Sequence, residues 1–302
     1  MKALIVGAGI GGLSAAIALR RRGIEAVVFE RATGLKDIGA GIAIAANAMK
    51  ALAWLGSADV VRKIGAQPRF YEIRSWRGEV LSRVPMPELG ERVGADSIAA
   101  HRADLQAALL KALEEAEGEV KLGARCVDFG QNEGNVAVFL ADGREEYGDL
   151  LVGADGLRST VRAQLLGDGP PRYASYTAWH AVVGEEPDLV PEEIGIESWG
   201  KGLRFLCARI GRGMVYWAAA KNSPEGEGDR LGGGAKDALL EDFRGWHAPV
   251  EALIRAADED AILYTDIYDR EPARRWGEGQ VTLFGDAAHP MTPDLGQGPT
   301  KP

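Results

Sequence analysis

The sequence is poor in cysteine and has no apolar run of membrane-spanning length. Its 302 residues include two cysteines, Cys126 and Cys207, which are too few and too isolated to indicate a disulfide framework or a zinc site. The four histidines show no metal-ligand spacing, so we expect no metal. The apolar start at residues 3–6 ends at Gly7, and we therefore expect neither a signal peptide nor a membrane span. This composition favours a protein of the reducing cytoplasm.

Positive charge is also in deficit. The chain has 35 Lys and Arg residues against 44 Asp and Glu, a formal net charge of -9, which argues against nucleic-acid binding because phosphate contacts need an excess of cations. An anionic ligand would therefore need local donors. Glycine, by contrast, is abundant: 40 residues gather in short motifs. Such motifs indicate backbone that lies close to a ligand or to another backbone.

The N-terminal segment has the pattern of a strand, a helix and a second strand. Residues 2–6 and 26–29 form apolar runs, while residues 13–22 have helical periodicity and follow a glycine turn at residues 7–12. This pattern predicts two buried parallel strands joined by a helix.

The glycine turn carries a dinucleotide-binding spacing. Gly7, Gly9 and Gly12 match Gly-x-Gly-x-x-Gly, and Glu30 ends the second apolar run. In such a turn the backbone approaches a pyrophosphate, the helix N-terminus holds its charge, and the acidic residue binds a ribose. A purely structural glycine turn is the alternative, but the flanking strands favour dinucleotide binding.

Two later clusters also come where apolar runs end. Residues 153–162 read Gly-Ala-Asp-Gly-Leu-Arg-Ser-Thr-Val-Arg, and residues 285–290 read Gly-Asp-Ala-Ala-His-Pro after the run at 280–284. Each cluster places a carboxylate, Asp155 or Asp286, at the end of a predicted strand. A plain turn with a serine helix cap is the alternative for the first cluster.

Residues 173–220 have a different pattern. Trp, Tyr and Val occur in alternating runs, and a turn at residues 211–213 separates two of them. This predicts an antiparallel sheet that contains a hairpin. The glycine- and charge-rich stretch at residues 223–234 is interpreted as a mobile loop. Because cofactor-type sequence lies on both sides, we expect the sheet to be inserted.

The three clusters, in this order and spacing, resemble those of the group A flavoprotein monooxygenases, the para-hydroxybenzoate hydroxylase-like aromatic-ring hydroxylases. The resemblance covers essentially the whole chain, and its most specific part is Asp155-Gly156 together with residues 285–290. It implies an α/β fold in which a Rossmann-like FAD/NAD(P)-binding domain of three layers (ββα) carries an inserted antiparallel β-sheet domain for the substrate. Similar chains act on salicylate, urate, 6-hydroxynicotinate or carotenoid rings.

The resemblance also implies domain boundaries. The FAD-binding domain is expected to be discontinuous and to comprise residues 1–71, 99–172 and 265–302. The substrate domain would comprise residues 72–98 and 173–264.

Several residues match FAD-binding positions of the family. By this likeness the glycines of the turn hold the pyrophosphate, Glu30 holds the adenosine ribose, Asp155 serves both FAD and the nicotinamide coenzyme, and Asp286 binds the ribityl chain. The full set of cofactor-binding residues that the resemblance implies is Gly7, Gly9, Ile10, Gly11, Gly12, Glu30, Arg31, Gly41, Ile42, Arg102, Cys126, Val127, Asp155, Gly285, Asp286, Pro293, Gly296 and Gly298.

The implied activity is a monooxygenation of a small aromatic or planar substrate. NADH or NADPH reduces the flavin, dioxygen adds at its C4a carbon, and the resulting hydroperoxide hydroxylates or epoxidises the substrate, while the protein orients the ring and excludes water. On the substrate side we expect Arg204, Tyr216 and Pro293, with Arg204 holding a phenolate or carboxylate. Trp179, His180 and Trp217 could add planar surface, or they could be ordinary sheet residues. A monomer or a homodimer is expected.

The C-terminal end departs from the family pattern. Family members commonly continue Gly-Ala-Asn-Gln-Ala, where residues 298–302 read Gly-Pro-Thr-Lys-Pro, which is what the codons GGC GCC AAC CAA GCC would encode after loss of one base. A frameshifted or truncated member, with impaired activity or FAD binding, is therefore one alternative hypothesis. Another FAD enzyme, such as a halogenase or an isoprenoid reductase, is a second, although the chain lacks the halogenase Trp-x-Trp-x-Ile-Pro segment. A plain NAD dehydrogenase leaves the two later clusters unexplained.

Overall fold

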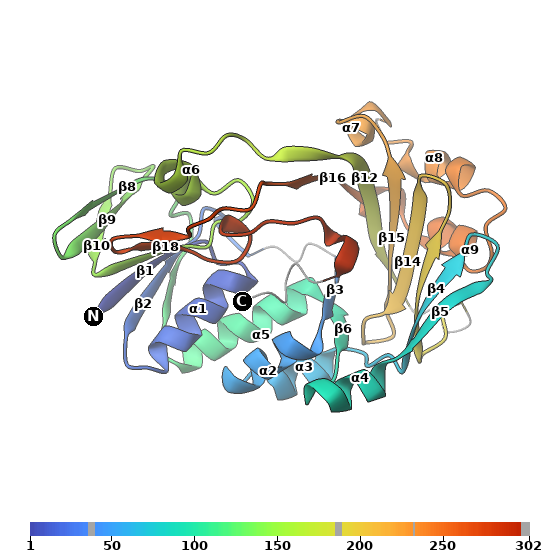
Figure 1. Ribbon diagram of the computed structural model, residues 1–302, viewed down its shortest axis with the longest axis horizontal. Coiled ribbons are helices and arrows are strands. Elements are labelled where there is room, and N and C mark those ends of the chain that lie inside the picture. Colours follow the sequence, from blue (N-terminus) through green and yellow to red (C-terminus); the bar gives the residue numbers. More distant parts are fainter. Residues whose placement is uncertain (36–39, 185–188, 232, 297–302) are drawn as a thin grey trace.

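The chain folds into two lobes that lie side by side along the long axis of the molecule (Figure 1). The computed structural model describes residues 1–35, 40–184, 189–231 and 233–296. Within these ranges, no helix combines the length and the apolar character needed to cross a bilayer.

The first lobe contains a six-stranded sheet. The sheet is parallel except for its edge strand β17, which is antiparallel to β18. The predicted strand, helix and strand at the N-terminus are confirmed as β1, α1 and β2. In spatial order the strands are β17 (Gly277–Glu278), β18 (Val281–Leu283), β11 (Leu150–Gly153), β1 (Lys2–Val6), β2 (Glu25–Phe29) and β7 (Glu119–Lys121).

Alternation along β1 and β2 gives this sheet two buried faces. On one face Ile5 and Val28 pack against the helices α1 (Ile10–Arg20) and α5 (Arg102–Glu115). On the other face Leu4 and its neighbours pack against a small antiparallel sheet and the helix that follows β11, namely β8 (Cys126–Asn132), β9 (Asn135–Leu140), β10 (Glu145–Gly148) and α6 (Thr160–Leu166). The sheet, the small sheet and the helices form the predicted three layers.

The second lobe contains a seven-stranded sheet. Neighbouring strands are antiparallel except β13 and β4, and the predicted hairpin turn at residues 211–213 joins β14 to β15. Strand β16 crosses the predicted domain boundary at residue 264, and the boundaries remain predictions. In spatial order the strands are β16 (Leu263–Asp269), β12 (Arg172–Val183), β15 (Val215–Asn222), β14 (Leu203–Arg209), β13 (Ile194–Trp199), β4 (Phe70–Ser75) and β5 (Val80–Pro85).

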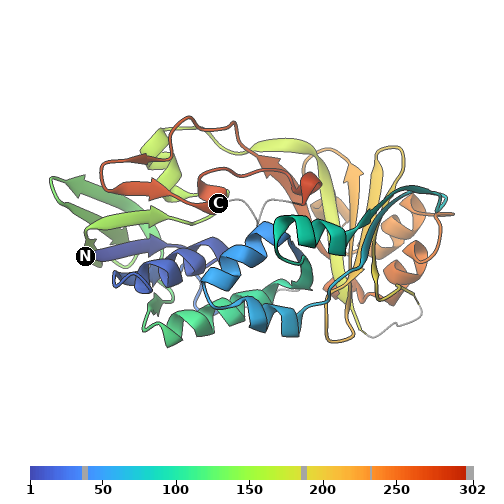
Figure 2. The same ribbon diagram turned by 60° about the horizontal axis from the view of Figure 1, so that its bottom comes forward.

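Short elements connect the two lobes. The strands β3 (Gly41–Ile44) and β6 (Ile98–His101) pair antiparallel and, with α4 (Met86–Val93), lie between the two larger sheets in both views (Figures 1 and 2). The helices α2 (Ala46–Trp54) and α3 (Ala58–Ile64) complete this region.

Three helices follow β15, namely α7 (Glu227–Leu231), α8 (Ala235–Asp242) and α9 (Val250–Ala256). The prediction of an irregular mobile loop over residues 223–234 was wrong for α7. The start of α7 is held in place because the Gly226 N–H donates a hydrogen bond to Asp266 Oδ2 of β16 at 2.8 Å. In a solvated loop this N–H would bind water. In the part of the chain that the structure describes there are also three short 3₁₀ turns, namely η1 (Glu259–Ala261), η2 (Gly285–Ala287) and η3 (Pro293–Leu295).

Candidate active site

The three predicted clusters meet at one edge of the first sheet. Their strands β1, β11 and β18 are neighbours and parallel, so their carboxyl ends coincide. Gly7 has φ +104°, and a Cβ there would lie 2.4 Å from the carbonyl oxygen of Ala154. A Cβ on Gly11 would lie 3.3 Å from the Phe284 ring, one residue before Gly285. The turns that follow the three strands are therefore in contact.

Gly12 and Gly9 have different surroundings. A Cβ on Gly12 would lie 1.9 Å from the carbonyl oxygen of Gly7, so this glycine allows α1 to pack on the turn. Around Gly9 no described atom lies within 4 Å of a Cβ position. Gly9 is also the N-cap of α1, and no side chain of the described residues caps this helix. The N–H groups of Ile10 and Gly11 in the first turn can therefore meet an anion, which fits the pyrophosphate of FAD.

Glu30 lies beside the glycine turn and helps to hold it. Its carboxylate accepts hydrogen bonds from the N–H of Ala8 at 2.9 Å and of Ala32 at 2.9 Å. On the other side of the turn, Gln106 Nε2 donates to the carbonyl oxygen of Ala8 at 2.8 Å, a contact that the sequence did not predict. Arg31 follows Glu30 and is exposed.

The Asp155 carboxylate caps the helix α6. It accepts hydrogen bonds from the Ser159 hydroxyl and from the Thr160 N–H at 2.7 Å, and Ser159 Oγ accepts from the Arg162 N–H at 2.9 Å. The helix cap considered as an alternative is thus present. Burial and then the charge of Asp155 raise the pKa of the Cys126 thiol to about 11.

Asp286 lies in η2, within electrostatic reach of Arg102. Burial raises the pKa of Asp286, and the charges of Arg102 and His289 partly oppose this rise. Arg102 is the first residue of α5 and is exposed. Burial and then the Arg102 charge lower the pKa of His180 on β12. Arg102 therefore lies within electrostatic reach of both the third cluster and the second sheet.

Arg162 ties the second cluster to the third, a role that the sequence did not predict. Its guanidinium is buried and donates to the carbonyl oxygens of Ala287 at 3.1 Å and of Ala288 at 2.7 Å. Its Nε also donates to Asp168 at 2.6 Å. These bonds fix the turn that contains Asp286.

The two faces of the second sheet differ in character. Trp179 and Trp217 are fully buried in the core formed with α8 and α9. Because side chains alternate along a strand, His180, Arg204 and Tyr216 lie on the opposite face, toward the first lobe. Of the two interpretations left open for these tryptophans, the second therefore holds: they are ordinary sheet residues that pack in the core.

Tyr216 packs against β3, which contains Gly41 and Ile42, two of the residues expected to bind FAD. A Cβ on Gly41 would lie 2.3 Å from Tyr216 Cγ, so only glycine allows this approach, and Ile42 beside it is buried. The rings of Tyr216 and His180 lie 6.3 Å apart. Burial raises the pKa of Tyr216 to about 12.

Arg204 lies between two carboxylates. Its Nη2 is 2.9 Å from Asp294 Oδ1, and its Nη1 is 3.5 Å from Glu197 Oε1. The Tyr176 hydroxyl donates to Asp294 at 3.0 Å, and the Tyr71 hydroxyl donates to Glu197. Apart from Arg204, the sequence reasoning missed this cluster. Strand alternation was the available signal, since it places the strand residues of the cluster on one face.

The remaining predicted residues are spread around these loops. Pro293 begins η3 and, with Asp286, lines a cavity of about 150 Å³. Gly296 ends η3 with φ +61°, whereas Gly298 lies outside the described residues. Val127 is exposed on β8, next to Cys126.

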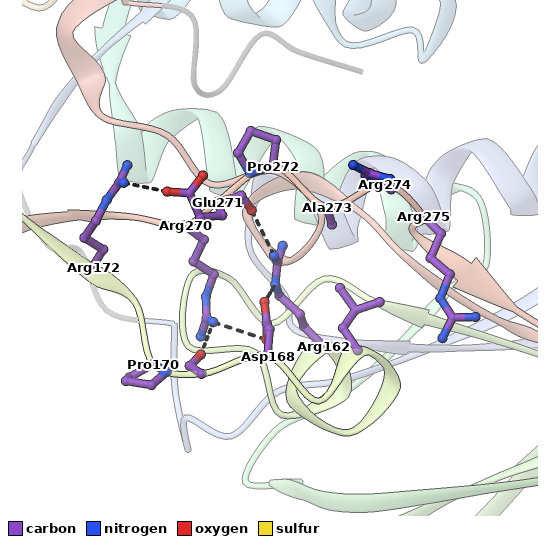
Figure 3. A pocket seen from close by; sticks show the side chains of 12 residues that line it. Arg162, Asp168, Pro170, Arg172, Arg270, Glu271, Pro272, Ala273, Arg274 and Arg275 are labelled. Atoms are coloured by element: carbon purple, nitrogen blue, oxygen red, sulfur yellow. Dashed lines mark hydrogen bonds and ion pairs between the residues drawn. The ribbon is translucent and has the colours of Figure 1, made fainter.

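A second cavity, of about 510 Å³, is rich in arginine (Figure 3). Arg162 and Arg270 converge on Asp168, with Nε–Oδ2 and Nη1–Oδ1 distances of 2.6 and 3.3 Å. Within the described ranges Arg274 makes no ion pair. The arginines that line this cavity are Arg162, Arg172, Arg270, Arg274 and Arg275.

Comparison with known proteins agrees with this geometry. The family model described as "FAD binding domain" matches residues 1–197. An aurachin C monooxygenase/isomerase of Stigmatella aurantiaca is 46% identical over 98% of this chain and 76% of its own length. An FAD-dependent urate hydroxylase of Klebsiella pneumoniae is 36% identical over 99% of this chain and 77% of its own length.

A solved structure has the same fold. Klebsiella pneumoniae HpxO complexed with FAD and uric acid superposes with a TM-score of 0.91 at 34% identity, over 99% of this chain and 76% of that one. The chain therefore belongs to the FAD-binding domain family and, within it, to the group A flavoprotein monooxygenases.

Proposed function

We propose that this chain binds FAD and uses NADH or NADPH with dioxygen to hydroxylate or epoxidise a small planar substrate. The observation that carries the proposal is the meeting of three strand-end turns opposite a polar sheet face. Relatives named as an FAD-dependent urate hydroxylase and as monooxygenases support it.

The residues around the glycine turn fit FAD. Gly9 and the first turn of α1 would hold the pyrophosphate, Glu30 the ribose, and Asp286 with Arg102 the ribityl and phosphate region. When bound, FAD supplies the redox chemistry: it accepts a hydride and activates dioxygen. The positive charge of Arg102 would stabilise the anionic groups of the cofactor.

The second sheet would hold the substrate. Tyr216 and His180 face the turns, and both favour their neutral forms, so the Tyr216 hydroxyl can donate a hydrogen bond to a ring oxygen. Tyr216 against Gly41 closes one side of this space and excludes water, which limits unproductive loss of reducing equivalents.

The arginine-lined cavity would receive the phosphates of the nicotinamide coenzyme. It adjoins the third cluster, because Arg162 contacts both. The guanidinium group of arginine can donate two parallel hydrogen bonds to phosphate oxygens. Among the described residues, Arg274 is the arginine of this cavity that makes no ion pair. An Arg274→Gln variant should raise the KM for NAD(P)H and leave the bound-flavin spectrum unchanged.

The proposal is tested by visible absorption and coenzyme consumption. The chain purified with added FAD should show a protein-shifted flavin spectrum, and NAD(P)H oxidation in air should rise when a planar substrate is added. Product analysis should find one substrate oxygen derived from ¹⁸O₂. Folded protein without bound flavin, or oxidation that no substrate stimulates, would contradict the proposal.

A further inference from the structure

The arginine that faces the first lobe is already neutralised. Arg204 forms ion pairs with both Glu197 and Asp294. One cation and two carboxylates leave this part of the face with a net negative charge. Arg204 is therefore a poor anchor for a third carboxylate, contrary to what its residue type alone suggests.

Both carboxylates accept hydrogen bonds from other side chains, although Asp294 is exposed. Glu197 is buried, and both the Tyr71 hydroxyl and Trp199 Nε1, at 2.7 Å, donate to it. Asp294 accepts from Tyr176 at 3.0 and 3.1 Å. Burial raises the pKa of Asp294, but hydrogen bonds from Thr292, Tyr176 and Arg204 and the Arg204 charge outweigh it, so the pKa falls and the group stays ionised.

The rest of this face supplies little compensating charge. Burial and Arg102 lower the pKa of His180, which favours the neutral imidazole. Tyr216 is a neutral phenol at physiological pH. Arg102 itself acts on Asp286. Among the described residues of the face, Arg204 thus remains the principal cation, and it already pairs with two carboxylates.

We propose that the substrate of this site is a neutral planar ring that presents an N–H or O–H donor to Asp294, and not an aromatic carboxylate. The inference rests on the proposed function and specifies its substrate class. A donor on the ring meets carboxylate oxygens that can each accept more than one hydrogen bond. A carboxylate on the ring would add like charge in a partly buried site, which binding discriminates against strongly.

Matched ligand pairs test this directly. 2-Hydroxypyridine and 6-hydroxynicotinate differ by one carboxylate, as do 4-hydroxyquinoline and 4-hydroxyquinoline-2-carboxylate. Titration calorimetry on the full chain, with and without saturating FAD, should give a dissociation constant on the order of tenfold lower for the neutral member of each pair.

Three variants separate the effect of charge from the effect of shape. Asp294→Asn should reduce the preference for the neutral ring by about tenfold, because it removes one like charge. Tyr176→Phe keeps the Asp294 charge and should keep the preference. Asp142→Asn removes the same charge from an exposed turn, where Asp142 pairs with Arg144, and should change nothing.

The outcomes are distinct from those of the proposed function. Equal or tighter binding of the carboxylate member, an unchanged ratio in Asp294→Asn, or no binding of either pair would overturn the inference. Because binding is measured without turnover, a chain that never oxidises NAD(P)H but prefers neutral rings would contradict the proposed function alone.

Discussion

Arg162 Nη1 donates a hydrogen bond of 2.7 Å to the carbonyl oxygen of Ala288, which lies 126 residues further along the chain. This bond joins α6, which Asp155 caps, to the turn that contains Asp286. The second and third clusters therefore form one unit, although neither Arg162 nor Ala288 points to a cofactor role in the sequence.

Arg162→Met should lower the free energy of unfolding by about 3–5 kcal/mol, because Asp168 and two carbonyl groups would lose a buried partner. Urea denaturation measures the change. Arg158→Met is the matched control: Arg158 stacks on Tyr268 at 5.2 Å, and its loss should cost about 1 kcal/mol or less. Equal effects of the two substitutions would show that the buried network contributes little.

Alanine substitution should affect stability at one glycine of the first turn and FAD binding at another. In Gly12→Ala the new Cβ meets the Gly7 carbonyl oxygen at 1.9 Å, and we expect a loss of about 3 kcal/mol or more of stability. In Gly9→Ala the Cβ meets no described atom, so stability should change by about 1 kcal/mol at most. FAD titration of Gly9→Ala should nevertheless show weaker binding if this backbone holds the pyrophosphate. Unchanged FAD affinity would show that the pyrophosphate does not bind at this backbone.

The local part of the structure could be predicted from the sequence. Apolar runs and glycine turns fix β1, α1 and β2, and the hairpin turn at residues 211–213 is marked by two glycines, because these features depend on neighbours in sequence. The meeting of the three clusters depends on the parallel order of β1, β11 and β18, whereas the sequence predicted a parallel pair only for residues 2–6 and 26–29. The family resemblance supplied the roles of individual residues, which remain predictions.

The contacts across the molecule could not be predicted in the same way. Asp294 meets Arg204 only because η3 returns to the second sheet, and no local pattern indicates that return. For Trp179 and Trp217 the sequence left two interpretations open, because residue type alone does not say which of the two alternating faces of a strand a side chain occupies. The start of α7 depended on a hydrogen bond from Gly226 to Asp266.

The same alternation predicts opposite effects for neighbouring residues of β12 and β15. Trp217→Ala removes a fully buried side chain stacked on Phe205 at 5.6 Å and should cost about 3–5 kcal/mol of stability. His180→Ala should cost about 1 kcal/mol and mainly weaken substrate binding. Thermal unfolding and ligand titration separate the two effects. A large stability loss in His180→Ala with unchanged binding would contradict the assignment of the faces.

Tyr216 should make stability depend on pH in the alkaline range. Its pKa is raised from 10.0 to about 12 because burial disfavours the phenolate. The folded state therefore holds the proton more tightly than the unfolded state. This contribution is complete below pH 10 and is lost as the pH rises from 10 to 12; a shift of this size corresponds to at most about 2.7 kcal/mol.

Tyr216→Phe isolates that contribution, because the variant keeps the ring and removes the titrating group. The difference in free energy of unfolding between the two proteins should be constant from pH 7 to 9. Above pH 10 the wild-type chain should lose stability relative to the variant. In a pH titration followed by absorbance at 295 nm, Tyr216→Phe should show one tyrosine fewer among those that ionise well above pH 10. Parallel stability curves up to pH 11.5 would show that the hydroxyl reaches water, and the Tyr216 ring would then not close the substrate side of the site.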